Sequence, residues 1–465
     1  MPRQDEAAAN SADLSADVVI PGPQGSTVLK NILLNRNDDG VRRLVQMHQS
    51  YGDLVHLQIA NRHIYLIFHP DDVQRVLQMN NRNYVKGELL DKLRVAAGNG
   101  LFTSEGDFWR RQRRMMQPFF HRTVIASFGE IMVGEIGKLL AQWDQYAAAG
   151  TAFELQEQMM RVTLSVVAKA LFTTALGDAE LATVHETLGP ILSEIAARSR
   201  RPFGLVEKLP TRANRAFTRN LARLDAIVDA IIAQHRARGA AYGDLLQMLI
   251  DARDEETGEA MSDQQLRDEV ITLFVAGHET TATALTWAFK LLSEQPVVRR
   301  VLYEEVDRVL GGRTPTAADF SNLPYALAVF EETLRLYPPV VNIVRTALEA
   351  DTLAGHTLPG GSNVVIPTYA LHRHPAFWAN PEGFDPTRML PEGRKGQHRF
   401  AYIPFSAGPR FCIGESFARL EAVLILAMVA QRFEVNLAPG QRIDMRSLGT
   451  LRPAPGVNVV LKPRG

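Results

Sequence analysis

Hydrophobic and polar positions alternate with two different periods along this chain, and the helical period covers most of it. From about Asp107 to Leu310 apolar residues recur at intervals of three and four, as in Leu221, Leu224, Ile227 and Ile231. This spacing places them on one face of an α-helix. The segments between the periodic stretches are short, and no internal repeat is found. The pattern therefore predicts many helices packed around a shared apolar core.

Patterns typical of strands are found mainly near the two ends of the chain. Residues 55–59 and 64–68 flank a polar turn, which predicts a β-hairpin. Asp71 and Asp72 are expected to cap a short helix, and strand-like runs return at 357–367 and 457–462. Strands and helices do not alternate, so a doubly wound parallel sheet is disfavoured. We expect a mainly α fold with a small β portion: a disordered tail over residues 1–18 and one large domain over 19–465.

Composition narrows the classes of function. Lys+Arg and Asp+Glu both number 51, so the overall charge gives no reason to expect binding to nucleic acid or to an anionic membrane. The N-terminus lacks the basic and apolar regions of a signal peptide, and no run approaches about 18 apolar residues. We therefore expect a cytoplasmic protein without a transmembrane anchor. The single cysteine, Cys412, excludes an intramolecular disulfide and a Cys-rich zinc site.

A lone cysteine is most often a small buried hydrophobe, so its neighbours must decide its role. Phe405, Gly408, Arg410, Cys412 and Gly414 form the pattern F-x-x-G-x-R-x-C-x-G. A metal-binding sulfur must be a thiolate, which apolar burial alone opposes. The two glycines would let backbone N–H groups approach the sulfur, and a helix predicted over 415–432 would direct its positive end toward it. An inert cysteine in a turn would leave these neighbours unexplained.

A second unusual segment lies in the middle of a helix predicted over 263–292. This helix is apolar on most faces, yet residues 276–281 read Ala-Gly-His-Glu-Thr-Thr. Glycine costs about 1 kcal/mol there relative to alanine, and an unpaired buried carboxylate costs more. Such violations tend to mark functional sites. The alternative is a polar kink in which Thr280 bonds to a carbonyl one turn back. We interpret His278 as a solvent-facing or core histidine, not as a metal ligand.

Together these two segments resemble the haem-binding loop and the oxygen-activation motif of the cytochrome P-450 family. The resemblance covers roughly residues 20 to 465. It implies the cytochrome P-450 fold and haem b (iron protoporphyrin IX), with Cys412 as the ligand to the iron. In this family Phe405 would shield the sulfur, Arg410 would pair with a haem propionate, and Gly414 would belong to the cofactor-binding loop. Gly277 would open space for dioxygen, Thr280 would hydrogen-bond to it, and Glu279 would relay protons.

Other segments match further motifs of the family in the expected order. Glu332 and Arg335 stand at i and i+3, on one helix face, and Arg388 ends a later F-x-P-x-R element. The resemblance implies a structural network of these three residues that holds the cysteine loop. It also implies that Trp109, Arg113 and Arg345 donate to the haem propionates. The alternative for Trp109 and Arg113 is a solvated basic helix.

The resemblance implies a monooxygenase that inserts one oxygen atom from O2 by hydroxylation or epoxidation. Electrons would come from a separate ferredoxin or flavodoxin and its NAD(P)H reductase. A peroxide-driven peroxygenase and a non-catalytic haem sensor are the alternatives, and either would make Glu279 and Thr280 superfluous. We expect the acidic partner to dock on a patch of cations formed by Arg110, Arg111, Arg114, Arg394, Lys395 and Arg399.

The expected substrate is lipophilic. Residues 98–104 resemble a segment of fatty-acid-hydroxylating members of the family, in which the phenylalanine lies over the haem. The other expected pocket positions are apolar, and an apolar wall favours a fatty acid or a terpenoid-like compound, because an unpaired polar group is costly to bury. The predicted substrate-binding residues are Phe102, Phe274, Val275, Ala276, Val340, Val341, Ile343, Leu448 and Leu451.

Overall fold

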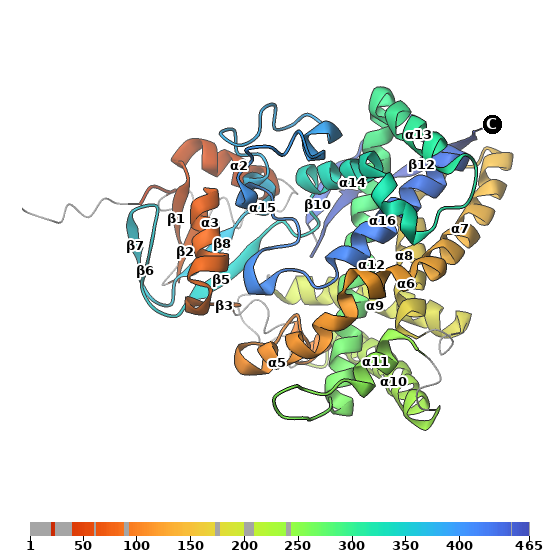
Figure 1. Cartoon of the computed structure of the whole chain (residues 1–465). Coiled ribbons are helices and arrows are strands. Elements are labelled where there is room, and N and C mark those ends of the chain that lie inside the picture. Colours follow the sequence, from red (N-terminus) through yellow and green to blue (C-terminus); the bar gives the residue numbers. More distant parts are fainter. Residues whose placement is uncertain are drawn as a thin grey trace, which may run out of the picture.

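The computed structural model describes residues 20–23, 40–59, 62–87, 93–172, 177–199, 209–238, 243–447 and 449–464. The expected tail over residues 1–18 and the predicted pocket residue Leu448 lie outside these ranges. Within them a β-rich part lies on one side of the molecule and a larger helical part on the other (Figure 1). The mainly α fold class is thereby confirmed. No helix in the described ranges is long and apolar enough to cross a membrane.

The β-rich part is built around a five-stranded sheet with the strand order β1-β2-β8-β5-β3. The predicted hairpin over 55–68 is confirmed, with β1 and β2 antiparallel. The neighbours β2 and β8 are parallel, so the late part of the chain completes a sheet that the early part begins. The strands of this sheet are β1 (Leu54–Ile59), β2 (Arg62–Ile67), β3 (Tyr84–Val85), β5 (Ile343–Ala347) and β8 (Asn363–Ile366).

Short helices and small sheets complete this part of the molecule. The helix α3 begins after His69, whose side chain accepts a hydrogen bond from the Asp71 N–H. Asp71 and Asp72 therefore lie in the first turn rather than at the cap that we expected. The other elements here are α2 (Gly40–Tyr51), α3 (Pro70–Gln74), η1 (Arg75–Met79), η2 (Asn81–Asn83), β6 (Asp351–Leu353), β7 (His356–Leu358) and α15 (Thr368–Leu371).

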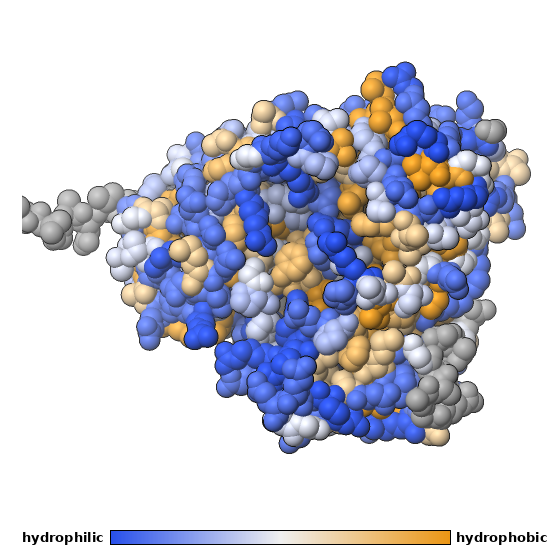
Figure 2. Space-filling model, in the orientation of Figure 1, coloured by the Kyte–Doolittle hydropathy of each residue, from blue (hydrophilic) through white to orange (hydrophobic). Residues whose placement is uncertain are grey.

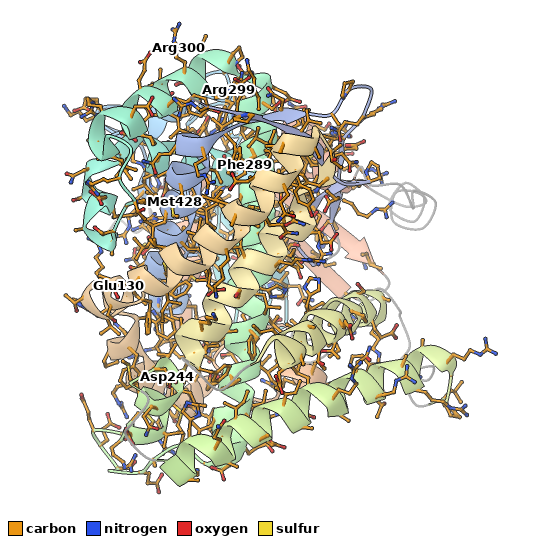
Figure 3. The ribbon with its side chains drawn as sticks, turned by 90° about the vertical axis from the view of Figure 1, so that its right-hand side faces the viewer. Glu130, Asp244, Phe289, Arg299, Arg300 and Met428 are labelled. Atoms are coloured by element: carbon orange, nitrogen blue, oxygen red, sulfur yellow. The ribbon has the colours of Figure 1, made fainter. Side chains whose placement is uncertain are left out.

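The helical part surrounds α12 (Asp263–Glu294), whose first turn is held by a capping box between Ser262 and Gln265. Phe289 of α12 and Met428 of α16 are both buried, whereas Arg300 of α13 projects outward (Figure 3). The other helices are α4 (Arg94–Ala97), α5 (Gly106–Met116), α6 (Arg122–Ser127), α7 (Gly129–Ala149), α8 (Leu155–Leu171), α9 (Asp178–Ser199), α10 (Arg212–Arg238), α11 (Leu245–Asp251), α13 (Pro296–Leu310), α14 (Pro324–Leu336) and α16 (Glu415–Arg432).

Two small sheets complete the helical part, and most of their strands come from the end of the chain. One has the strand order β4-β12-β9 and the other pairs β10 with β11. Their strands are β4 (Phe153–Glu154), β9 (Phe433–Leu437), β10 (Asp444–Ser447), β11 (Leu451–Ala454) and β12 (Asn458–Pro463). Besides η2, the described residues contain the short 3-10 helices η3 (Gln117–Phe120), η5 (Ala317–Asn322), η6 (Pro386–Met389), η7 (Arg399–Ala401) and η8 (Gly408–Arg410).

Candidate functional site

The cysteine loop lies just before α16, which begins at Glu415 as the sequence predicts. The Cys412 N–H donates to the Phe405 carbonyl at 2.9 Å and so closes the loop. Gly408 serves a purpose different from the one that we expected. Its φ is +68°, and a Cβ there would lie 1.8 Å from the carbonyl oxygen of Leu77. Glycine is therefore required because the loop passes close to η1.

Opposing effects act on the Cys412 thiol. Burial raises its pKa, while hydrogen bonds from the Gly414 and Glu415 N–H groups and the nearby Arg113 guanidinium lower it. Arg113 also donates to the Phe411 carbonyl at 2.8 Å, which fixes α5 against the loop. The Cys412 side chain nevertheless has exposed surface. The sulfur is therefore accessible to a ligand although protein atoms crowd around it.

Several cations gather beside this loop. The Arg410 guanidinium stacks 3.7 Å from the centre of the Trp109 ring and forms an ion pair with Glu105. Burial lowers the pKa of Arg410 to about 10. Burial, together with nearby Arg410, lowers the pKa of Lys86 to about 7. Arg345 is also buried, and its Nη1 donates to the Val344 carbonyl at 2.8 Å.

This cluster contains more positive than negative side chains. Glu105 is the carboxylate that acts on both Lys86 and Arg410. Our sequence analysis missed Lys86 and Glu105, because neither belongs to a recognised motif. The position of Glu105 immediately before the Trp109 helix was the only available signal. A buried cation excess of this kind favours an anionic group at the site.

The middle of α12 presents two different faces. Ala276 is exposed and Thr280 is partly exposed, and the Thr280 hydroxyl donates to the Ala276 carbonyl at 2.7 Å. This is the kink bond that we considered as the alternative for Thr280. His278, by contrast, is a buried core histidine whose Nδ1 lies 2.8 Å from the Phe274 carbonyl oxygen. A Cβ at Gly277 would lie 2.9 Å from Val167 Cγ2, so this glycine lets α8 approach α12.

Glu279 is buried and is paired with the β10–β11 hairpin. Its Oε1 accepts from Arg452 Nε at 3.1 Å and lies 2.7 Å from Arg452 Nη2. The Thr450 hydroxyl also donates to Oε1. The carboxylate in the middle of this helix is therefore neither orphaned nor bound to its own helix. A partly exposed arginine connects it to the protein surface.

The predicted Glu332–Arg335–Arg388 arrangement is present. Glu332 and Arg335 are fully buried, with Oε1 and Nη2 2.7 Å apart, and Arg388 Nε lies 3.5 Å from the same Oε1. Arg335 also donates to the His372 carbonyl at 3.1 Å. The ring of His372, whose pKa burial lowers to about 3, accepts the Ile403 N–H at 2.9 Å. The network thus reaches the backbone two residues before Phe405.

Glu331, adjacent to Glu332, makes a second connection that our sequence analysis missed. Its carboxylate lies 2.7 Å from Arg394 Nη2 and 2.6 Å from Arg419 Nε, and its carbonyl accepts from the Tyr402 hydroxyl at 2.7 Å. Any helix can carry two adjacent glutamates, so the sequence gives no signal for this role. Glu331 ties α14 to both sides of the cysteine loop.

The expected cationic docking patch is largely neutralised by ion pairs. Arg110 pairs with Asp107 and Arg111 with Glu259, while Arg114 pairs with Asp254 and Glu256. Arg394 is held by Glu331. The surface of this face is mainly hydrophilic, with hydrophobic residues gathered near the middle of the view (Figure 2). The helix charges that we assigned to a partner therefore bind acidic residues of this chain.

The predicted substrate-binding residues do not form one wall. Phe274 is fully buried and packs against Phe172 at 5.5 Å, on the α12 face that carries His278. It lies two residues, or about 200° around the helix, from Ala276. Val341 and Leu451 pack in a cluster around Trp287, and Ile343 belongs to the core beside the five-stranded sheet. Phe274, Val341, Ile343 and Leu451 thus have packing roles in this structure.

The remaining pocket candidates are placed differently. Phe102 and Val340 are about half exposed, and Val275 lines an apolar cavity together with residues of α4, α9 and α10. The segment that carries Phe102 is anchored to α12, since the Asn99 N–H donates to Asp268 at 2.7 Å and the Leu101 N–H to Glu269 at 2.9 Å. Val275, Ala276, Phe102 and Val340 therefore remain candidates for substrate contact.

Comparison with known proteins agrees with this arrangement. The family model of cytochrome P-450 matches residues 20–461. The chain belongs to the cytochrome P-450 family. It is 42% identical to cyclooctatin synthase of Streptomyces melanosporofaciens, over 89% of this chain and 90% of the relative. It is 34% identical to pentalenene oxygenase of Streptomyces avermitilis, over 86% and 88%. The crystal structure of the cytochrome P-450DA heme domain superposes with a TM-score of 0.87, at 28% identity, over 96% and 98%.

The residues of this cytochrome P-450 fit haem b, the cofactor of the family. Cys412 provides a sulfur ligand with accessible surface. The cation excess of Lys86, Arg345 and Arg410 matches the two propionate carboxylates. The face of α12 with Ala276 and Thr280 has exposed surface, as a cofactor chamber requires. The protein is a haem-thiolate monooxygenase that needs O2 and a redox partner.

Proposed function

We propose that this monooxygenase oxidises a terpenoid hydrocarbon, with electrons from a separate ferredoxin or flavodoxin. The observation that carries the proposal is the aliphatic lining of a small cavity, about 10 Å³ in volume, beside Val275 and between α4, α9, α10 and α12. Every side chain that lines it is aliphatic, and none can form a hydrogen bond. The lining residues are Leu93, Ala96, Ala97, Leu188, Ile191, Leu192, Ile195, Leu224, Ile271 and Val275.

Such a wall favours a ring hydrocarbon over a fatty acid. Burying a carboxylate or an unpaired hydroxyl against it costs about 1–3 kcal/mol or more, whereas each buried CH2 gains about 0.8 kcal/mol. The relatives support this choice. They include proteins described as cyclooctatin synthase, cyclooctat-9-en-7-ol 5-monooxygenase and pentalenene oxygenase. The resemblance of the Phe102 segment to fatty-acid hydroxylases is the weaker argument, because that ring is half exposed.

The chain's own residues have separate tasks in the proposed reaction. Haem b, when bound, supplies the oxygen chemistry. Cys412 holds the cofactor through its sulfur, and Arg113 and the Gly414 N–H stabilise the charge on that sulfur. Arg452 and Thr450 hold the Glu279 carboxylate at Oε1, and this carboxylate is the group that takes up and releases protons beside Thr280. Thr280, the next residue, presents its hydroxyl oxygen on the exposed face of the helix. The aliphatic wall excludes water and orients the substrate by shape.

Ligand binding to the ferric holoprotein tests the substrate class. A panel of cyclic sesquiterpenes, cyclic diterpenes and saturated fatty acids of matched carbon number is titrated against the low-spin haem spectrum. We expect the cyclic hydrocarbons to give the high-spin shift at lower concentration than the fatty acids. The opposite order would contradict the terpenoid proposal while leaving the monooxygenase assignment intact.

Variants locate the binding wall. Ile191→Gln places an amide in the aliphatic cavity and should weaken hydrocarbon binding by about tenfold or more. Leu209→Gln is the matched control, because Leu209 is 55% exposed and does not line the cavity. Phe102→Ala should change the position of oxidation if the Phe102 ring contacts substrate.

Product formed with hydrogen peroxide alone, at the rate seen with reductase and ferredoxin, would favour the peroxygenase alternative.

A further inference from the structure

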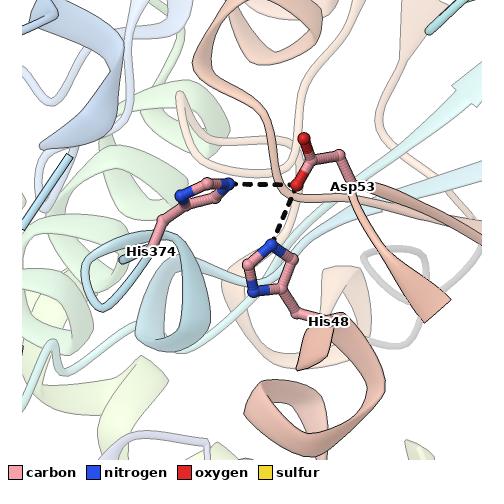
Figure 4. A group of neighbouring side chains, drawn as sticks. All are labelled: His48, Asp53 and His374. Carbon is pink, nitrogen blue, oxygen red and sulfur yellow. Dashed lines mark hydrogen bonds and ion pairs between the residues drawn. The ribbon is translucent and has the colours of Figure 1, made fainter. Parts of the chain in front are cut away.

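Three potential metal ligands meet on the β-rich side, away from the haem site. His48 belongs to α2, Asp53 directly precedes β1, and His374 follows α15 (Figure 4). The Nε2 atoms of His48 and His374 lie 2.8 and 3.0 Å from the same Asp53 oxygen, Oδ1. The three ligand atoms all lie within 4.8 Å of one another. The fold therefore brings together groups that are 321 positions apart in the sequence.

We propose that His48, Asp53 and His374 bind a divalent transition-metal ion, with Zn²⁺ as the best match. Two imidazoles and one carboxylate form a common three-ligand zinc set, with water at the fourth position. Bonds of about 2.0–2.1 Å in a tetrahedron separate ligand atoms by roughly 3.3 Å. The separations of 2.8 and 3.0 Å from Asp53 Oδ1 would have to open by a few tenths of an ångström. The two Nε2 atoms, which lie within 4.8 Å of each other, would have to take up the same spacing.

The surroundings of the three side chains suit a metal. The imidazoles of His48 and His374 are 10% and 7% exposed, whereas Asp53 is 40% exposed and leaves one side open for water. Phe68 lies 5.1 Å from the His48 ring and Phe377 lies 4.9 Å from the His374 ring. These aromatic walls limit the motion of the imidazoles, so the ligands are largely preorganised.

Charge also favours a cation here. In the described part of the chain no lysine or arginine forms an ion pair with Asp53, whose hydrogen-bond partners are the two imidazoles. The Asp72 carboxylate acts electrostatically on the same region. A dication would neutralise this local negative charge, which the imidazoles in their neutral form do not do.

Coordination requires both imidazoles to give up the Nε2 proton that faces Asp53. The His48 proton moves to Nδ1 of its own ring. The Ala376 N–H donates to His374 Nδ1 at 3.2 Å, which leaves the ring proton on Nε2, facing Asp53. When Nε2 binds a metal this proton moves to Nδ1, and the Ala376 N–H turns to another acceptor. The bond that must break is long, and the proton is conserved within the ring.

A metal at this position would join α2, the start of β1 and the segment after α15. That segment begins with His372, which holds the Ile403 N–H near the cysteine loop at 2.9 Å. The site would therefore fasten the β-rich part to the segment that supports the cysteine loop. This joining role does not depend on which substrate the monooxygenase oxidises.

Equilibrium dialysis tests the proposal on the untagged, haem-loaded full chain. The protein is dialysed against micromolar Zn²⁺, and zinc and iron are counted together by elemental analysis. We expect one zinc per iron in the wild type. Asp53→Asn and His374→Gln should weaken Zn²⁺ binding by about tenfold or more, because each removes one ligand. His63→Gln is the matched control, because His63 and His56 form an exposed imidazole pair, 2.9 Å apart, without a carboxylate partner.

Every result bears on the proposal. Zinc retained by His63→Gln and lost by Asp53→Asn, with both variants showing the haem-thiolate carbon monoxide spectrum, supports it. Zn²⁺ should then also raise the melting temperature of the wild type and of His63→Gln but not of Asp53→Asn. A wild type that binds no zinc, or a zinc content unchanged in Asp53→Asn, overturns it. Should Asp53→Asn fail to hold haem, His48→Gln and His374→Gln provide the same test.

Discussion

The carboxylate of Glu279 and the guanidinium of Arg452 form an ion pair across 173 positions of sequence, with Nη2 and Oε1 2.7 Å apart. One partner lies in the buried middle of α12 and the other is partly exposed on β11. The pair thus provides a link from the solvent to the residue that precedes Thr280. A buried carboxylate needs a counter-charge whatever its function, so variants must distinguish a proton-carrying Glu279 from a purely structural one.

Glu279→Gln should therefore slow product formation while leaving the haem site intact. The amide keeps the shape and can still accept from Arg452 and Thr450, but it cannot carry a proton. Positioned acid–base groups typically contribute about 10²–10⁴-fold, so we expect a fall of at least about 10²-fold in turnover. Product and NAD(P)H consumption are measured in H2O and D2O, and the solvent isotope effect should rise in the variant.

Arg452→Gln should show the same defect in weaker form, because Thr450 still contacts Glu279. Arg446→Gln is the control, since Arg446 stands opposite Arg452 in β10 and is exposed. Equal losses in Arg446→Gln and Arg452→Gln would show that general surface charge, rather than the pair, is responsible.

Thr280→Ala is expected to uncouple electron use from product formation. The structure shows that the Thr280 hydroxyl donates to the Ala276 carbonyl at 2.7 Å, which a helix residue without catalytic function would also do. Thr286 makes the same bond to the Ala282 carbonyl at 2.8 Å, in a fully buried part of α12. Thr286→Ala is thus a matched control for loss of the helix bond. Peroxide released per NAD(P)H should rise in Thr280→Ala and not in Thr286→Ala; the same rise in both would assign Thr280 a structural role only.

The sequence predicted the local parts of the site well. The hairpin of β1 and β2, the bounds of α16 and the course of α12 all follow from periodicity and capping signals. The cysteine loop and the Glu332–Arg335 pair lie within short motifs, so their residues were identifiable without the fold. Contacts at i and i+3 or within a tight loop depend on nearby positions alone.

The partners from distant segments could not be predicted in the same way. Arg410 pairs with Glu105 across 305 positions, and periodicity reveals that a face is buried but not which segment covers it. The error at Phe274 has a related cause, because the motif indicated a region of α12 without fixing which of its faces points to substrate. The positive charges expected on α5 are neutralised because the acidic residues 254–259, far along the chain, form ion pairs with Arg111 and Arg114.

The buried Glu332–Arg335 pair should dominate the stability of the cysteine-loop support. Glu332→Gln leaves the Arg335 guanidinium buried without its counter-charge, which costs about 3–5 kcal/mol. We expect a lower melting temperature and loss of the haem-thiolate carbon monoxide spectrum on mild heating. Glu157→Gln removes an ion pair, with Arg161 at 2.5 Å, in which both side chains are about half exposed, so the cost should be at most about 1 kcal/mol. Comparable melting temperatures for the two variants would contradict the assigned role of Glu332.

Glu269 should make the stability of the protein depend on pH. Burial raises the pKa of this fully buried carboxyl from 4.5 to about 8, and Oε1 has no partner while Oε2 accepts the Leu101 N–H. Between about pH 4.5 and pH 8 the folded protein keeps a proton that the unfolded chain has released. The contribution of Glu269 to stability is therefore fully present below about pH 4.5 and is lost as the pH rises to about 8.

Glu269→Gln removes this dependence, because the amide does not ionise and still accepts the Leu101 N–H. The variant and the wild type should have similar melting temperatures near pH 5, and the variant should become the more stable protein near pH 8. Each unit of pKa shift corresponds to about 1.4 kcal/mol, so the difference should reach about 3–5 kcal/mol. Glu304→Gln, an exposed change on α13, serves as the control. Its melting temperature should equal that of the wild type at every pH. If the gap between Glu269→Gln and the wild type stays constant from pH 5 to pH 8, then Glu269 is ionised in the folded protein and its Oε1 has a partner that neutralises it.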